Sequence, residues 1–189
     1  MAEETTQEFA QEEATVEQTT AANVSARTVE MHRATANSVR ATQNITIRQG
    51  AVRDVRAQDV TVRQGAAWSL DADNVTIVQG AAGLVRSGEA NLGPGASSAA
   101  VIADGVNLDQ AAAQFILARD SVDLDQSAAG VLVGQHITAR DSSALLMFAN
   151  TVEGNVRVGM DRQAAMTFGA ALGAALGIVL ALFGVLKRK

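Results

Sequence analysis

Residues 60–84 read VTVRQGAAWSLDADNVTIVQGAAGL, and the second half of this stretch restates the first after fifteen residues. A triplet of apolar, polar and apolar residues opens each half, and similar triplets recur along the chain every fifteen or sixteen residues. Their first residues are Val29, Ile45, Val60, Val75, Ala90, Val106, Val122 and Ile137, with a weaker ninth copy at Val152. So regular a spacing indicates an internal structural repeat. A repeat of this kind constrains the whole fold, so it is considered before individual segments are assigned to strands or helices.

The alternation within each triplet is typical of a β-strand with one buried face. A corner follows it, with the sequence RQGA at Arg48 and Arg63 and VQGA at Val78, and glycine is expected to supply the backbone angles of that corner. A second short strand completes each repeat. Because two short strands cannot bury an apolar face alone, the repeats are expected to stack on one another.

We therefore predict an all-β fold, a single-stranded parallel β-solenoid over residues 24–160 with about eight or nine coils of 15–16 residues. Adjacent coils would lie about 4.8 Å apart, with like side chains above one another in columns. Hairpin arrays fit less well because only one strongly marked corner recurs in each repeat. Helical repeats usually exceed about thirty residues. The sequence leaves the handedness of the solenoid open. Connections between parallel strands are usually right-handed, but short coils with small cores also form left-handed solenoids.

Two sets of outward residues are candidate binding sites. The middle residues of three successive triplets, Thr46, Thr61 and Thr76, would form a flat polar ladder that a regular surface or another solenoid could bind. Arg48 and Arg63 would stack on adjacent coils, and such a basic stripe attracts anionic lipid or the acidic arm at the N-terminus of the chain. The solvated face of a strand shows the same pattern, so the columns alone do not establish a site.

The composition argues against enzymatic chemistry. Aromatic residues make up only 3% of the 189 residues, and the absence of cysteine excludes disulfides, thiol nucleophiles and thiolate metal sites. His32 and His136 are isolated, without the Ser or carboxylate partner at a spacing that a catalytic arrangement would need. We predict a protein that is not an enzyme, with no catalytic residue, no cofactor, no metal site and no nucleic-acid partner.

The first 23 residues form a separate segment. It carries six glutamates and no basic residue, namely Glu3, Glu4, Glu8, Glu12, Glu13 and Glu17. Repulsion among these charges and the scarcity of large apolar residues predict a disordered or transiently helical arm over residues 1–23. The segment lacks the positive start and apolar run of a signal peptide.

Residues 164–186 form an uncharged stretch, AAMTFGAALGAALGIVLALFGVL. A helix of this length would extend about 34 Å, enough to cross a hydrocarbon core of about 30 Å. Gly169, Gly173 and Gly177 would fall on one face of that helix, at a spacing that lets a second helix approach closely, although glycine is also common in membrane helices generally. We predict a single-pass C-terminal transmembrane helix followed by a basic tail, residues 187–189.

The side of the membrane on which the solenoid lies depends on two opposing signals. Positive residues beside a span usually stay cytoplasmic, which would place the solenoid outside. No signal peptide directs it there, so we favour a tail-anchored protein with a cytoplasmic solenoid. The expected partners are the lipid bilayer and further copies of the chain, joined through coil edges or through the glycine face of the membrane helix.

The periodicity and the small, β-branched cores of the triplets resemble those of the bactofilins, over about residues 24–160. In these bacterial cytoskeletal proteins a short parallel β-helix with flexible tails polymerises end to end, so the resemblance implies a scaffold and transfers no catalytic residue. The chain departs from the family in its shorter repeat and its C-terminal anchor. The favoured function is a non-catalytic, membrane-anchored rod that self-associates or presents its ladder to a partner. The alternative is a surface-displayed binding or adhesion module.

Overall fold

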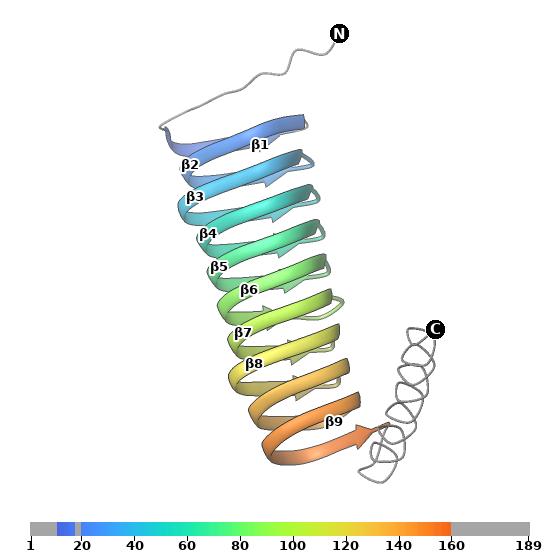
Figure 1. Ribbon diagram of the computed structural model, residues 1–189. Helices are drawn as coiled ribbons and strands as arrows, with labels where there is room; N and C mark the ends of the chain where they lie inside the picture. The colour runs from blue at the N-terminus through green and yellow to red at the C-terminus, as the bar shows by residue number, and fades with distance from the viewer. Residues whose placement is uncertain (1–10, 18–19, 160–189) are drawn as a thin grey trace, which may run out of the picture.

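The computed structural model describes residues 11–17 and 20–159, which form one parallel sheet wound into a solenoid (Figure 1). The strands pair in sequence order, each with its neighbours along the chain. They are β1 (Gln11–Glu17), β2 (Thr20–His32), β3 (Thr35–Arg48), β4 (Ala51–Arg63), β5 (Ala66–Val78), β6 (Ala81–Leu92), β7 (Ser97–Asp109), β8 (Ala112–Asp125) and β9 (Ala128–Val158). The predicted all-β parallel β-solenoid is confirmed.

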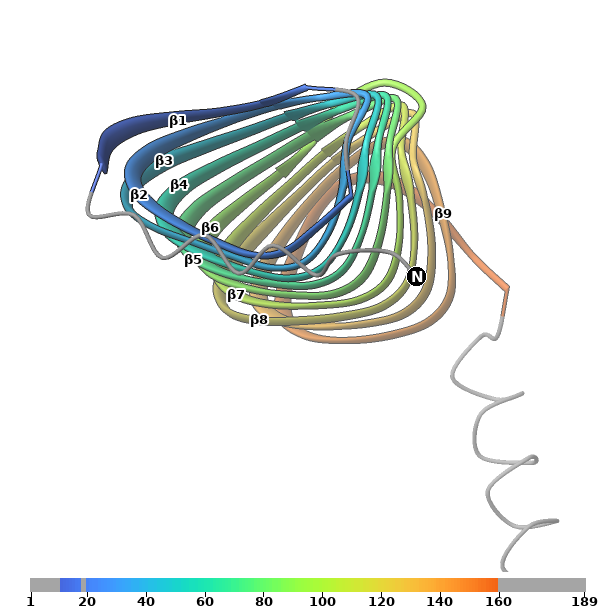
Figure 2. The ribbon, with the colours of Figure 1, turned by 90° about the horizontal axis from the view of Figure 1, so that it is seen from above.

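Each repeat occupies one coil, and equivalent residues lie in columns along the solenoid axis. Val29 pairs with Ile45, and Ile45 pairs with Val60. The same column continues through Val75, Ala90, Val106, Val122 and Ile137. Seen along the axis, the coils lie over one another (Figure 2). The spacing of the triplets in the sequence is therefore the register of the sheet.

Each middle coil is one continuous strand that bends around the core, and not two short strands separated by a turn. The strands β2 to β8 have 12–14 residues each, and the 31 residues of β9 make the last two coils. Coils with sixteen residues absorb the extra residue locally. Pairing shifts between Ala26 and Thr28 and again between Ala103 and Gly105, as at a β-bulge.

The core is a stack of aliphatic side chains, and within the described residues it contains no aromatic ring. Its largest fully buried members are Met31, Ile45, Ile47, Leu70, Ile77, Leu92, Ile116, Leu132 and Ile137. Burying one such side chain contributes about 1.5–3 kcal/mol. Each coil supplies only a few of them, so stability depends on stacking coil on coil.

A residue with a positive φ angle occupies the sharp corner after each of the strands β2 to β8 and the corresponding corner within β9. It is a glutamine in five coils, at Gln49, Gln64, Gln79, Gln110 and Gln126, with φ between 46° and 56°. Where QG occurs, glycine follows that residue and is needed for space, since a Cβ at Gly65 would lie 2.7 Å from the carbonyl oxygen of Gly50. The prediction that glycine supplies the backbone angles of the QG corners is therefore wrong.

Hydrogen bonds between coils stabilise these corners. The Gln64 N–H donates to the carbonyl oxygen of Val78 at 3.1 Å. The glutamine side chains form a ladder in which Gln49 Nε2 donates to Gln64 Oε1 at 3.2 Å and Gln64 Nε2 donates to Gln79 Oε1 at 3.1 Å. A left-handed residue that is not glycine costs about 1–2 kcal/mol, which these bonds partly offset.

The solenoid begins inside the range expected to form the acidic arm. In β1, Ala14 pairs with Val29 and Val16 pairs with Met31, so both continue core columns. The glutamates beside them are exposed, and Glu12 Oε1 lies 3.6 Å from Arg27 Nη1. Acidic charge in this stretch thus marks the outer face of a strand. Residues 1–10 lie outside the described residues.

The predicted membrane helix, residues 164–186 with Gly169, Gly173 and Gly177, also lies outside the described residues, as does the tail 187–189. Within residues 11–17 and 20–159 no helix has the length and apolar character needed to cross a bilayer.

Candidate functional site

The predicted threonine ladder forms one outward column. Thr46 pairs with Thr61, Thr61 pairs with Thr76, and all three are partly exposed. The column continues with Asn91 and Asn107, where Asn107 Nδ2 donates a hydrogen bond of 2.9 Å to Asn91 Oδ1. A partner that follows this part of the column would therefore meet hydroxyl groups in three coils and amide groups in the next two, with carboxylates at Glu30 and Asp123 on either side.

The arginine stripe is short. Arg48 pairs with Arg63 in the sheet, and the next residue of that column is apolar. A second outward column carries Arg40 and Arg56 side by side. Arg56 Nε lies 3.8 Å from Asp71 Oδ2 of the following coil, which relieves part of the repulsion. Exposed ion pairs of this kind contribute little to stability, so their main effect is on surface charge.

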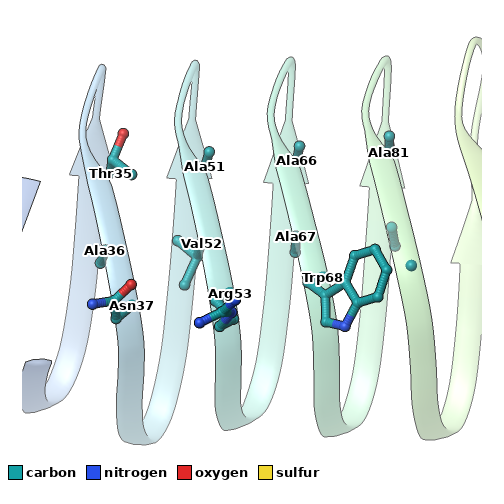
Figure 3. Close-up of a pocket in the computed structure, with 12 residues that line it drawn as sticks. Thr35, Ala36, Asn37, Ala51, Val52, Arg53, Ala66, Ala67, Trp68 and Ala81 are labelled. Carbon is teal, nitrogen blue, oxygen red and sulfur yellow. The ribbon is translucent and has the colours of Figure 1, made fainter. Parts of the chain in front are cut away.

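A shallow groove of about 760 Å³ crosses the coils of β3 to β6. Ala51, Ala66 and Ala81 stack in register along it, and the indole of Trp68 stands beside them, 71% exposed (Figure 3). The ring packs next to Gly83, where an added Cβ would lie 3.3 Å from Trp68 Cδ2. Trp68 is therefore a surface residue and does not belong to the core.

Two neighbouring outward columns change from polar to apolar along the solenoid. One column runs through Arg40, Arg56, Asp71, Arg86, Ile102, Leu117 and Val133. The other runs through Ser38, Asp54, Ser69, Leu84, Ala100, Phe115 and Val131. Further exposed apolar side chains follow in the last coil. We call the exposed residues Ile102, Phe115, Leu117, Leu145 and Phe148 the apolar face.

The two ends of the described solenoid leave strand edges and core columns uncovered by other described residues. Ile137 is 1% exposed, whereas Val152, fifteen residues later in the last coil, is 43% exposed. Met147 in the same coil is only partly buried. At the other end β1 pairs with β2 on one side, and its second edge faces no described strand. Unpaired edges of this kind can template the addition of another strand.

The two histidines lie far apart in the solenoid, His32 at the end of β2 and His136 within β9. His32 Nε2 lies 3.9 Å from Glu30 Oε2, and His136 is exposed. Within residues 11–17 and 20–159 no three His, Asp or Glu side chains gather where they could hold a metal ion. That the chain is not an enzyme and takes no cofactor stays a prediction.

Comparisons with protein-family models, with curated proteins and with solved structures return no match. The β-solenoid fold that the resemblance to the bactofilins implied is present, and membership of that family stays a prediction.

Two features of the surface were not predicted from the sequence, although each has a sequence signal. The glutamine ladder appears as glutamine recurring at the corner of five repeats. The apolar face appears as the runs FIL at 115–117 and LLMF at 145–148, where earlier repeats have polar residues at the outward positions. Both signals need the register of the coils, because only the register says which side of the strand a residue occupies.

Proposed function

We propose that the chain is a non-catalytic structural protein, a β-solenoid rod that stacks end to end with further copies and is anchored in a membrane by residues 164–186. The observation that carries the proposal is the open last coil. Val152 is 43% exposed. The equivalent residues one and two coils earlier, Ile137 and Val122, are at most 1% exposed. A further coil placed on this end would complete the same column.

The first coil of another copy is suited to fill this position. It presents Ala14 and Val16 in the columns of Val29 and Met31, so a parallel stack would continue the core from one rod into the next. The contact is head to tail, and such contacts generate open filaments when the rotation does not close. Covering Val152 and Met147 would contribute on the order of 1–3 kcal/mol. The backbone hydrogen bonds of the strand edge would have to supply most of the remaining affinity.

Stacking is tested by sedimentation velocity of the full chain in mild detergent. We expect a series of species that correspond to two or more rods, and we expect Val152→Asp to reduce the chain to single rods. Thr138→Asp is the matched control, because it adds the same charge one coil earlier on the outward column. Circular dichroism checks that both variants keep the fold. Wild type that sediments only as single rods, or equal loss in both variants, would contradict stacking.

Anchoring rests on the uncharged stretch at residues 164–186, which is long enough to span a bilayer. Deleting residues 164–189 should move the protein from the membrane pellet to the soluble fraction after an alkaline carbonate wash. A deletion variant that stays in the pellet would show that the anchor lies elsewhere in the chain.

A second candidate function is a binding or adhesion module, and the groove beside Trp68 favours it. A highly exposed indole above a flat, alanine-lined surface offers a stacking platform for a ring-shaped ligand or a partner side chain. Because Trp68 is the only tryptophan, its fluorescence reports binding directly. A saturable shift of its emission on titration with soluble polysaccharides, lost in Ala66→Arg, would support this function; an unchanged emission would count against polysaccharide as the ligand.

A further inference from the structure

We propose that the apolar face is a side-by-side contact between two parallel copies of this chain. The inference names a second partner surface for the proposed scaffold, and its parallel orientation rests on that proposed function. The contact differs from end-to-end stacking because it lies along the sides of β7 to β9 and leaves the strand edges free. It also differs from the glycine face of the predicted membrane helix.

The face departs from what a solvated strand surface requires. Phe115 and Leu117 flank the buried Ile116 and are 56% and 49% exposed. Their equivalents three coils earlier are Ser69 and Asp71. In a strand with one solvated face, polar outward residues normally alternate with buried apolar residues, and the earlier coils follow this pattern. A contiguous apolar patch on a protein surface usually marks an interaction site.

The apolar segment of the same chain is the wrong length to cover this face. The face occupies four coils, so about 14 Å separates its first and last coil along the axis. Residues 164–186 would form a helix of about 34 Å. Laid back along the solenoid, the helix would overhang by about four coils onto Arg86, Asp71 and Arg56, and would bring the basic tail close to Arg40. Apolar residues over charged ones, and cations beside cations, disfavour that arrangement.

A bilayer fits the surroundings of the face less well than a second copy does. Residues 97–159 carry seven acidic and three basic residues, a net charge of −4. Asp104 and Arg119 beside the face pair with each other at 3.0 Å. The other acidic residues lie elsewhere on these coils, such as Asp123 on the ladder column, six residues further along β8 than Leu117. An anionic membrane attracts a protein through unpaired basic residues, and the basic residue beside this face is already paired with an acidic one.

The size of the face predicts a weak contact. Its five side chains expose on the order of 500 Å² per copy, so a pair would bury about 1,000 Å², the lower limit for a specific interface. Anchoring both copies in one membrane would raise their effective concentration and make so small an interface sufficient. In a parallel pair the chain leaves both rods after residue 159 at the same end, so both copies can be anchored on one side of the pair. Arg56 and Arg86 then face their own counterparts, which confines the contact to β7–β9.

The test uses single-cysteine variants of the full chain in lipid vesicles, because the chain has no cysteine of its own. Leu117→Cys places a thiol on the apolar face, and Asp123→Cys places one in the same strand on the ladder column. With a short bifunctional maleimide, we expect Leu117→Cys to form covalent dimers about tenfold faster than Asp123→Cys, as a contact at high effective concentration requires. Equal rates would overturn the proposal.

A second pair of variants tests the face without moving the thiol. Phe115→Glu in the Leu117→Cys background should lower cross-linking to the Asp123→Cys rate, while Ser69→Glu in the same column should leave it unchanged. Quenching of a fluorophore on Leu117→Cys by quencher-labelled lipid would place the face on the bilayer and overturn the proposal. If Leu117→Cys cross-links fast but a carbonate wash extracts the protein, the membrane anchor is refuted and the contact through the apolar face is supported. If the protein stays in the membrane but Leu117→Cys cross-links slowly, the anchor is supported and the contact is refuted.

Discussion

Replacing Gln64 by glycine should give a more stable protein than replacing it by alanine, the reverse of the usual order within a strand. Gln64 has a φ of 55°. Alanine at this angle keeps a penalty of about 1–2 kcal/mol, which glycine removes. Glycine in turn loses about 0.5–1 kcal/mol through the greater freedom of the unfolded chain. Both variants lose the same two side-chain hydrogen bonds. With the middle of each range, the glycine variant should therefore be more stable by roughly 0.5–1 kcal/mol.

Urea unfolding of the full chain in mild detergent, followed by far-ultraviolet circular dichroism, measures this difference. With a slope of about 2–3 kcal/mol per molar urea, the midpoints should differ by roughly 0.2–0.5 M. The matched control is Thr61 in the extended part of β4, where the alanine variant should be the more stable of the pair. A Gln64→Ala protein as stable as Gln64→Gly would refute the explanation of the corner.

Three further substitutions test the packing of the coils by the same unfolding assay. Leu70→Ala, at a fully buried position, should cost roughly 2–4 kcal/mol, whereas Val152→Ala in the open last coil should cost less than about 1 kcal/mol; similar losses would mean that the last coil is covered. Ser87→Ala should stabilise the protein by about 0.5–1 kcal/mol, because among the described residues the buried Ser87 Oγ has no hydrogen-bond partner. A loss of stability would show that this oxygen does have a hydrogen-bond partner. Gly83→Ala should cost about 1–3 kcal/mol and shift the emission of Trp68, because its Cβ would lie 2.6 Å from the Trp68 carbonyl oxygen; an unchanged spectrum would contradict that contact.

The fold could be predicted because a parallel solenoid imposes one requirement on every repeat. Coils that stack in register must present the same columns, so the distance between Val60 and Val75 in the sequence is also the offset between β4 and β5. The repeat therefore encodes strand pairing directly. In most β-proteins pairing joins segments at irregular separations, and no such period would be visible.

The corners and the first coil could not be predicted in the same way, because inter-coil packing overrides local preference there. In a QG corner, glycine is the residue that adopts a positive φ most readily. The coils instead place Gln64 at that angle and use the missing side chain of Gly65 to approach Gly50. In β1 the excess of glutamate obscured Ala14 and Val16, which continue the core columns.

The surface was predicted only in part. The outward column of Thr46, Thr61 and Thr76 followed from the alternation within each triplet. Phe115 and Leu117 stand in an apolar run with the buried Ile116, and a run of this kind does not reveal which residues face outward until the register is known. The apolar face therefore became visible only when the coils were placed on one another.

Cryo-electron microscopy of the full chain in mild detergent tests end-to-end assembly of the solenoid most directly. Stacked rods should appear as filaments whose averaged power spectrum carries a meridional layer line at about 4.8 Å, because the coils of every copy would repeat along the filament axis. Single short particles would contradict end-to-end assembly. Filaments in which the 4.8 Å spacing lies on the equator would show that the rods associate only through their sides.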